Sequence, residues 1–228
     1  MLASTGARAT GAAAHAVVGI DFDNTVVCYD QLFHRLAVER SLLSRDVAPA
    51  KRAVRDHLRA AGCEDRWTEL QALAYGERIR EASAFPGVHD FVRVCAARGV
   101  ALFVVSHKTA RAYAGGDVDL REAARGWLGE QGFFAAGALR PADVYFEGTR
   151  EQKIARIEQL GCTHFVDDLA EFLAEPALPP DLVRILFAPE VAGDGRDGPA
   201  PCTRDGDAAW LRARSWPEVA AIVLGAAP

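Results

Sequence analysis

The sequence carries little that would tie it to a membrane or to a nucleic acid. No apolar run approaches the roughly 20 residues that a membrane-spanning helix needs. The formal net charge is −5 and the isoelectric point about 5.7, so the composition lacks the positive excess typical of proteins that bind nucleic acid or anionic membranes. The first 16 residues include one arginine but no sustained apolar segment, which argues against a cleaved secretory signal. We therefore expect a cytoplasmic protein with no nucleic-acid or membrane partner.

Cysteine is scarce and shows no pairing pattern. The five cysteines are odd in number, widely spaced and nowhere arranged as a CxxC pair; they are Cys28, Cys63, Cys95, Cys162 and Cys202. This pattern argues against a disulfide framework and a structural zinc site, and it is typical of a reducing compartment. We interpret Cys28 as a packing residue, because no base adjoins it in the sequence.

The hydrophobic pattern predicts an α/β fold. Short apolar runs alternate with longer segments of helical period, as in a doubly wound, Rossmann-like parallel sheet with helices on both faces. The predicted strands are 16–22, 100–105, 144–146, 163–166 and 183–187. The predicted helices are 88–97, 120–130, 150–160, 169–174 and 217–224. Gly99, Gly132 and Gly161 follow three of these helices, where a left-handed terminating residue is favoured.

One segment interrupts this alternation. Between Asp30 and Ala84 the sequence shows three helical patterns and no strand pattern, over a length too great for an ordinary connection. We predict an all-helical cap subdomain inserted at residues 29–84, within a core formed by residues 16–28 and 85–228. Residues 1–15 are expected to be a loose tail, and the Gly-, Pro- and Asp-rich segment 188–207 a loop.

Polar side chains gather where the predicted strands end. In an open parallel sheet, ligands bind beyond the carboxyl ends of the strands. The residues that follow the first, second and fourth predicted strands are Asp21, Asp23, Ser106, His107, Lys108, Asp167 and Asp168. Lys153 lies in the helix that leads into the fourth strand. We expect these groups to converge on one edge of the sheet.

Four carboxylates at one edge of the sheet would repel one another unless their charge is neutralised. The two usual solutions are a divalent metal bound through oxygen or a carboxylate that its neighbours keep protonated. Mg²⁺ fits best, because it prefers oxygen ligands and retains water and phosphate oxygens in its coordination shell. A lysine and a hydroxyl beside the metal would hold the remaining phosphate oxygens, which favours phosphoryl transfer.

The motifs resemble those of the haloacid dehalogenase (HAD) superfamily. "DFDNT" at Asp21–Thr25, Ser106 at the end of an apolar strand, Lys153 and "VDD" at Val166–Asp168 are similar to its four motifs in order and spacing. The resemblance covers most of the chain outside the tail. The helical insertion also lies between the first and second motifs, where that superfamily commonly carries a cap.

The resemblance implies a role for each motif residue. Asp21 would be the nucleophile that forms an aspartyl-phosphate, and Asp23 would protonate the leaving oxygen and then activate water. Ser106 and Lys153 would hold phosphate oxygens. The implied metal ligands are Asp21, Asp23 (through its backbone carbonyl), Asp167 and Asp168. An acid at Asp23 favours a phosphatase over a dehalogenase, because a halide leaves without a proton.

Further residues are candidates for substrate binding. Asn24 stands where the family often has glycine. Thr25 either contacts substrate or, as we favour, is a turn residue whose hydroxyl bonds a backbone amide. His107 and Lys108 lie in the mouth of the site, and Lys108 competes with Lys153 for the phosphate, where motif order favours Lys153. Six residues of the insertion could contact the leaving group, although Trp67 better fits a core position: Tyr29, Arg66, Trp67, Tyr75, Arg78 and Arg80.

The function that the resemblance implies is a magnesium-dependent phosphatase, acting on a sugar phosphate or similar small phosphate ester as a monomer or homodimer. A mutase that transfers the phosphoryl group to another hydroxyl uses the same motifs and stays open as an alternative. A third alternative is a binding or regulatory protein without turnover. It is disfavoured, because such proteins commonly lose a motif acid and this sequence retains them all.

Overall fold

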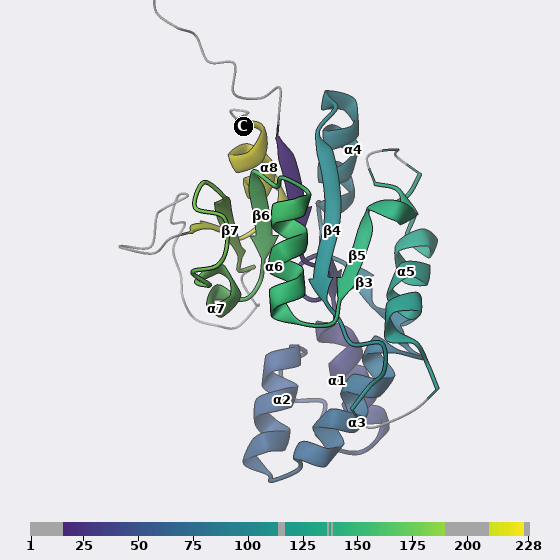
Figure 1. The fold of residues 1–228 in the computed structure, drawn as a ribbon. Helices are drawn as coiled ribbons and strands as arrows, with labels where there is room; N and C mark the ends of the chain where they lie inside the picture. The colour runs from purple at the N-terminus through teal and green to yellow at the C-terminus, as the bar shows by residue number, and fades with distance from the viewer. Residues whose placement is uncertain (1–15, 114–116, 136, 138, 190–209, 226–228) are drawn as a thin grey trace, which may run out of the picture.

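A parallel sheet forms the centre of the molecule. The computed structural model describes residues 16–113, 117–135, 137, 139–189 and 210–225. Six parallel strands lie in the order β5-β4-β1-β6-β7-β8. They are β1 (Val17–Ile20), β4 (Ala101–His107), β5 (Val144–Glu147), β6 (His164–Asp167), β7 (Val183–Phe187) and β8 (Leu211–Ala213). The sheet and the helices on its faces confirm the predicted doubly wound α/β fold (Figure 1).

The strands differ from the prediction mainly at their ends. β1 stops at Ile20 rather than at Phe22, so Asp21 already belongs to the loop that follows it. β4 continues through Ser106 to His107. The edge strand β8 was not predicted, because three residues are too few to show a period. The predicted tail at 1–15 and nearly all of the predicted loop at 188–207 lie outside the described residues.

Helices bury both faces of the sheet. One face packs against α4 (Val88–Arg98), α5 (Leu120–Glu130) and α8 (Trp216–Leu224), and the other packs against α6 (Arg150–Gln159) and α7 (Ala170–Leu173). Val104 and Val105 of β4 belong to these two separate clusters, one on each face. Two buried faces explain why the strand reads as a continuous apolar run. None of the described helices is both long and apolar enough to cross a bilayer.

Local signals in the sequence set the ends of the helices. The Asp119 carboxylate accepts hydrogen bonds from two backbone amides at the start of α5, and the Thr149 hydroxyl accepts one at the start of α6. Gly99, Gly132 and Gly161 all have positive φ angles, which confirms their prediction as left-handed terminating residues.

The insertion is helical, as predicted, except at its end, where Ser83–Ala84 form a two-residue strand that was not predicted. It contains α1 (Asp30–Glu39), α2 (Lys51–Ala60), α3 (Glu64–Tyr75) and the short 3₁₀ helix η1 (Ile79–Glu81). These elements lie beyond the end of the sheet toward which β4 points (Figure 1). The rings of Phe33 and Trp67 stack at 4.8 Å between centroids, so Trp67 is a core residue, as expected. We refer to α1, α2, α3 and η1 as the helical unit.

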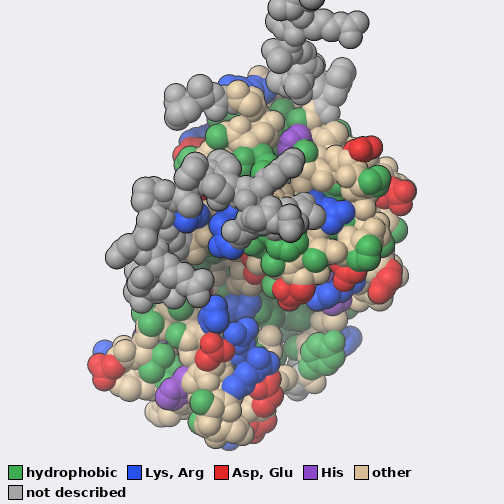
Figure 2. Space-filling view, turned by 90° about the vertical axis from the view of Figure 1, so that its left-hand side faces the viewer, with side chains coloured by type: hydrophobic (Ala, Val, Ile, Leu, Met, Phe, Trp, Pro, Cys, Tyr) green, Lys and Arg blue, Asp and Glu red, His purple; other side chains and the backbone are tan. Residues whose placement is uncertain are grey.

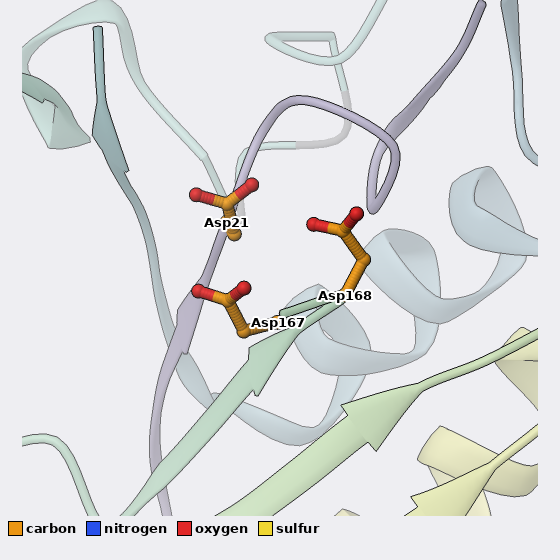
Figure 3. Close-up of side chains that lie close together, drawn as sticks. All are labelled: Asp21, Asp167 and Asp168. Carbon is orange, nitrogen blue, oxygen red and sulfur yellow. The ribbon is translucent and has the colours of Figure 1, made fainter. Parts of the chain in front are cut away.

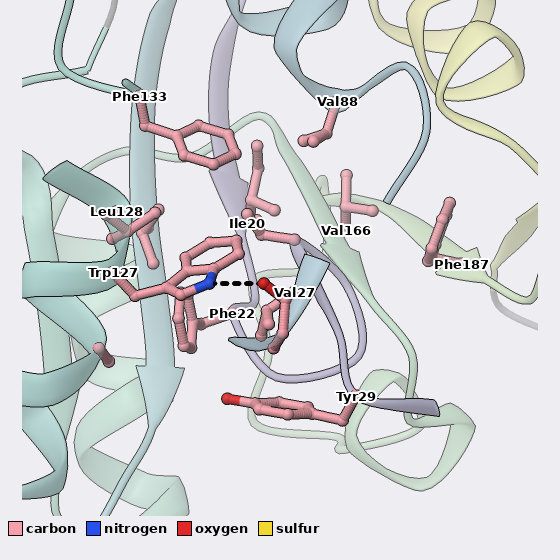
Figure 4. Close-up of a cluster of buried hydrophobic side chains, with 14 of the residues drawn as sticks. Ile20, Phe22, Val27, Tyr29, Val88, Trp127, Leu128, Phe133, Val166 and Phe187 are labelled. Atoms are coloured by element: carbon pink, nitrogen blue, oxygen red, sulfur yellow. Dashed lines mark hydrogen bonds between the residues drawn. The ribbon is translucent and has the colours of Figure 1, made fainter. Parts of the chain in front are cut away.

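A short ribbon joins the helical unit to the sheet. β2 (Val27–Cys28) pairs antiparallel with β3 (Ser83–Ala84), so the chain leaves and re-enters the core side by side. The Trp127 indole Nε1 donates a hydrogen bond of 3.0 Å to the Ala82 carbonyl oxygen, and Figure 4 shows this bond within the apolar cluster that surrounds Phe22 and Val27. This arrangement fastens the connection to α5 and holds the helical unit above the strand ends.

Candidate functional site

Asp21 lies at the centre of a buried polar cluster. It follows β1 directly, and its backbone amide donates to the Val166 carbonyl oxygen of β6 at 2.8 Å. Asp21 Oδ1 accepts hydrogen bonds from Ser106 Oγ at 2.8 Å and from Lys153 Nζ at 2.7 Å. All three side chains are buried. The described residues place no donor on Asp21 Oδ2, which leaves that oxygen to interact with a ligand.

Lys153 ties Asp21 to the adjacent strand. Its ammonium lies 2.7 Å from Asp167 Oδ2 as well as 2.7 Å from Asp21 Oδ1. The other carboxylate oxygen of Asp167 accepts the backbone amide of Leu169 at 2.9 Å. The Phe172 ring lies 4.1 Å from the ammonium and shields it from water. The position on the first turn of α6 therefore brings this lysine to the strand ends, as the motif order predicts.

Three carboxylates face a common space. Oxygen atoms of Asp21, Asp167 and Asp168 all lie within 4.8 Å of one another, and Figure 3 shows them at the ends of β1 and β6. Burial raises the pKa of Asp21 to about 7, although Lys153 partly offsets the rise. Burial and the two neighbouring carboxylates raise the pKa of Asp168 to about 8. A cation would relieve this repulsion, and an all-oxygen donor set suits Mg²⁺, so the residues fit the predicted metal.

Asp23 belongs to a second, separate ion pair. Lys108 Nζ lies 2.9 and 2.8 Å from its two carboxylate oxygens, and the Tyr29 hydroxyl donates to Oδ1 at 2.7 Å. Burial alone would raise the pKa of Asp23, but Lys108 and Tyr29 hold it below its ordinary value. The two lysines thus divide between the two aspartates: Lys153 contacts Asp21, and Lys108 contacts Asp23.

The loop after β1 explains one departure from the family motif. Asn24 has a φ of +60°, in the left-handed region where glycine is favoured and asparagine is tolerated better than most residues. The Thr25 hydroxyl is buried and has no hydrogen-bond partner among the described residues. Thr25 does lie in a turn, as preferred, but the predicted hydrogen bond from its hydroxyl to a backbone amide is wrong.

His107 does not join the other predicted site residues. It is exposed, and its Nε2 lies 3.0 Å from the Gly148 carbonyl oxygen. Successive side chains of a strand point to opposite faces, so Ser106 turns toward Asp21 while His107 turns away from it. The sequence analysis predicted that both residues lie at the end of one strand, but it did not predict that their side chains point to opposite faces.

Fewer residues of the insertion lie near the site than the six that the sequence analysis named as candidates. Tyr29 contacts Asp23, and the Tyr75 ring lies 5.0 Å from the Lys108 ammonium. The three arginines considered there form ion pairs instead: Arg66 with Glu69, Arg78 with Glu39 and Glu81, and Arg80 with Glu130. Sequence reasoning missed Lys51, whose ammonium interacts electrostatically with Asp23 and Asp168. Its only sequence signal is a lysine at the first position of a helix, where a cation is disfavoured.

Comparison with solved structures supports the fold. No family model and no curated protein sequence matches the chain significantly. A HAD family hydrolase from Deinococcus radiodurans R1, solved with bound phosphate and sodium, is similar at 16% identity and a TM-score of 0.51, over 93% of this chain and 96% of that one. A dehalogenase solved with an intermediate complex is similar at 15% identity and a TM-score of 0.50, over 92% and 98%.

At such low sequence identity, these two structures bear on the fold alone. The chain has the fold of the HAD-superfamily hydrolases, as the sequence resemblance implied.

Proposed function

We propose that the protein is a magnesium-dependent phosphatase that hydrolyses a small phosphate monoester through an aspartyl-phosphate on Asp21. The observation that carries this proposal is the environment of Asp21. A hydroxyl and an ammonium donate to Oδ1, Oδ2 accepts no hydrogen bond from the described residues, and two further carboxylates lie beside it. The similar HAD family hydrolase from Deinococcus radiodurans R1 was solved with bound phosphate and sodium, which is compatible with binding of a phosphate group and a cation by this fold.

Asp23 favours a phosphatase over a dehalogenase. A halide is stable as an anion and leaves without a proton, whereas an alkoxide leaving group needs one. Asp23 stands two residues from Asp21 and is held in place by Lys108 and Tyr29. A carboxyl group held beside the nucleophile can protonate the leaving oxygen of a phosphate ester, whereas halide displacement needs no such proton donor.

In the first step, an oxygen of Asp21 attacks phosphorus. The Asp21 oxygen–phosphorus bond forms as the bond to the leaving oxygen breaks, and the leaving oxygen takes its electron pair together with a proton from Asp23. Ser106 and Lys153 orient Asp21 and stabilise charge on the transferring oxygens. Bound Mg²⁺, held by Asp21, Asp167 and Asp168 with the Asp23 carbonyl, would supply positive charge that keeps Asp21 ionised and offsets the phosphate.

In the second step, water attacks the phosphoryl group on Asp21. Asp23, now ionised, accepts a proton from that water, and the Asp21–phosphorus bond breaks to release inorganic phosphate. Asp23 ends protonated again and Asp21 ionised, so the cycle closes. Lys108 and Tyr29 keep the carboxylate of Asp23 oriented throughout.

Asp23 is ionised in the free protein because its pKa is low, so it must gain a proton before it can act as the acid of the first step. An arriving phosphate dianion adds negative charge beside Asp23 and attracts Lys108 toward itself. Both effects raise the pKa of Asp23 and favour the protonated acid. Lys108 therefore links substrate binding to the protonation of Asp23.

A phosphate-release assay across sugar phosphates, nucleotides and phosphorylated amino acids tests the proposal. We expect turnover in Mg²⁺ that EDTA abolishes and excess Mg²⁺ restores. Asp21→Asn should lower kcat by at least about 10⁴-fold, because it removes the nucleophile. Asp90→Asn is the matched control, since Asp90 is exposed on α4, outside the site, and should leave the rate unchanged.

Two results would overturn the proposal. One is unaltered phosphatase activity in Asp21→Asn, which would exclude the covalent step. The other is an enzyme indifferent to chelation, which would exclude the metal. An isomerised phosphate ester in place of steady phosphate release would indicate the mutase instead.

A further inference from the structure

All three lysines of the chain converge on the candidate site. Of the 26 Lys and Arg residues, three are lysines: Lys51, Lys108 and Lys153. Arginine supplies every other permanent cation, including those in the surface ion pairs of the helical unit. A compact ammonium is thus kept for positions that face the carboxylates.

The three lysines differ in their partners. Lys153 pairs with Asp21 and Asp167, and Lys108 pairs with Asp23 through both carboxylate oxygens. Among the described residues, no carboxylate lies within ion-pair distance of Lys51. Its ammonium instead lies over the rings of Tyr29, Phe33 and Tyr75, at 5.8, 5.7 and 5.4 Å from their centroids. Lys51 is therefore the one lysine of the three that forms no ion pair with the described residues.

The fold holds Lys51 in place at an unfavourable position. It is the first residue of α2, where the helix dipole disfavours a positive charge. Its backbone amide donates to Asp30 Oδ1 at 2.8 Å, which fixes the start of α2 against the start of α1. Burial alone would lower the pKa of Lys51, but Tyr75, Asp23 and Asp168 raise it above its ordinary value, so the ammonium stays charged. A local cost of this kind is typical of a functional position.

The ammonium of Lys51 lies on the Asp23 side of the site. Its ammonium lies 5.8 Å from the centroid of the Tyr29 ring, whose hydroxyl donates to Asp23, the group assigned to the leaving oxygen. It also lies 5.4 Å from the centroid of the Tyr75 ring, which Lys108 approaches to 5.0 Å. Figure 2 shows Lys and Arg side chains gathered on the helical unit beside the hollow that separates it from the core. A ligand on the leaving-group side of Asp23 would therefore meet a positive charge.

We propose that Lys51, together with the Tyr75 ring, forms a subsite for a second anionic group on the leaving group of the substrate. The substrate class is a phosphate monoester whose leaving group carries a carboxylate or a further phosphate. This inference rests on the proposed phosphatase function and adds the specificity that the helical unit provides. The ammonium of Lys51 would bind that anion directly, and the aromatic ring would exclude water from the pair.

Matched substrate pairs test the subsite. 3-Phosphoglycerate and glycerol 3-phosphate differ by a carboxylate against a hydroxymethyl group, and fructose 1,6-bisphosphate and fructose 6-phosphate differ by one phosphate. For each pair, the ratio of kcat/KM values is measured in one protein preparation, so a loss of folded enzyme cancels. We expect the wild type to favour the doubly anionic member by roughly 10- to 100-fold in at least one pair, and the pair that responds identifies the anion.

Three variants separate recognition from structure. Lys51→Met should bring the ratio close to one, whereas Lys51→Arg should retain most of the preference because it keeps the charge. Arg66→Met is the control, since Arg66 lies on α3 and pairs with Glu69 at the surface. A purely structural role of Lys51 would lower both kcat/KM values together and leave the ratio unchanged.

The outcomes distinguish this inference from the proposed function. Phosphate release without preference in either pair, or a preference that survives in Lys51→Met, overturns the subsite and leaves the phosphatase standing. No phosphate release from any compound by the wild type overturns both.

Discussion

At the scale of single residues, the central finding is that two aspartates separated by a single residue occupy different electrostatic environments. Burial raises the pKa of Asp21, whereas Lys108 and Tyr29 outweigh burial and lower the pKa of Asp23. The sequence predicted the convergence of Asp21, Ser106, Lys153, Asp167 and Asp168, because motif residues at the ends of parallel strands share one edge. It could not predict how Lys108 and Lys153 divide between the two aspartates, which depends on side-chain directions.

Removing Lys153 should destabilise the fold as well as the site. Lys153→Met would leave Asp21 and Asp167 buried without their ion pair, and we expect a loss of about 3–5 kcal/mol in the free energy of unfolding. Urea denaturation followed by circular dichroism measures this loss. Arg59→Met, which removes an exposed ion pair with Glu64, should have little effect. Equal effects of the two substitutions would contradict the buried pair.

The contribution of Asp21 to stability without metal should fall as the pH rises. The pKa of Asp21 is raised from 3.8 in the unfolded chain to about 7, so the folded state binds this proton more tightly than the unfolded chain does. The stabilisation from the protonated Asp21 is therefore complete below about pH 4 and is lost as the pH rises to about 7. Mg²⁺ binds the ionised carboxylates and should therefore stabilise the protein more at pH 8 than at pH 5. Thermal unfolding in EDTA and in Mg²⁺ at both values measures this difference. A Mg²⁺ effect of equal size at both values would exclude the coupling.

At the scale of elements, helical period and terminating glycines located the helices well, and apolar runs located five strands. What could not be predicted depends on tertiary packing. β8 is too short to show a pattern, and the entry of Lys51 into the site depends on how the helical unit rests on the core. The direction of His107 follows from the register of β4 rather than from its place in the sequence.

The packing of β1 against β6 leaves no space at Gly19. A Cβ there would lie 2.6 Å from the Phe165 ring, so Gly19→Ala should destabilise the protein by about 1–3 kcal/mol through overpacking. Gly126 provides the matched control. It lies exposed within α5 with nothing within 4 Å of an added Cβ, and Gly126→Ala should stabilise by about 1 kcal/mol. Chemical denaturation of both variants checks the two signs, and a neutral Gly19→Ala would show that β1 and β6 separate readily.

At the scale of the whole molecule, one buried cluster runs from the sheet into the helical unit. It includes Ile20 and Trp127 of the core together with Phe33 and Trp67 of the insertion. Continuous packing of this kind predicts cooperative unfolding of both parts. Tryptophan fluorescence and circular dichroism should therefore give coincident urea transitions. An early fluorescence transition that Trp67→Phe removes would show that the helical unit unfolds by itself.

The most direct test of the account is to trap the phosphoryl group on the protein. Enzyme turning over a phosphate ester in Mg²⁺ is quenched in acid, and the intact mass and the digested peptides are measured. The covalent mechanism predicts a mass increase of one phosphoryl group, located on Asp21. This increase should be absent from both Asp21→Asn and the EDTA-treated enzyme. Rapid turnover with no phosphoryl group on Asp21, or with one on another residue, would contradict it.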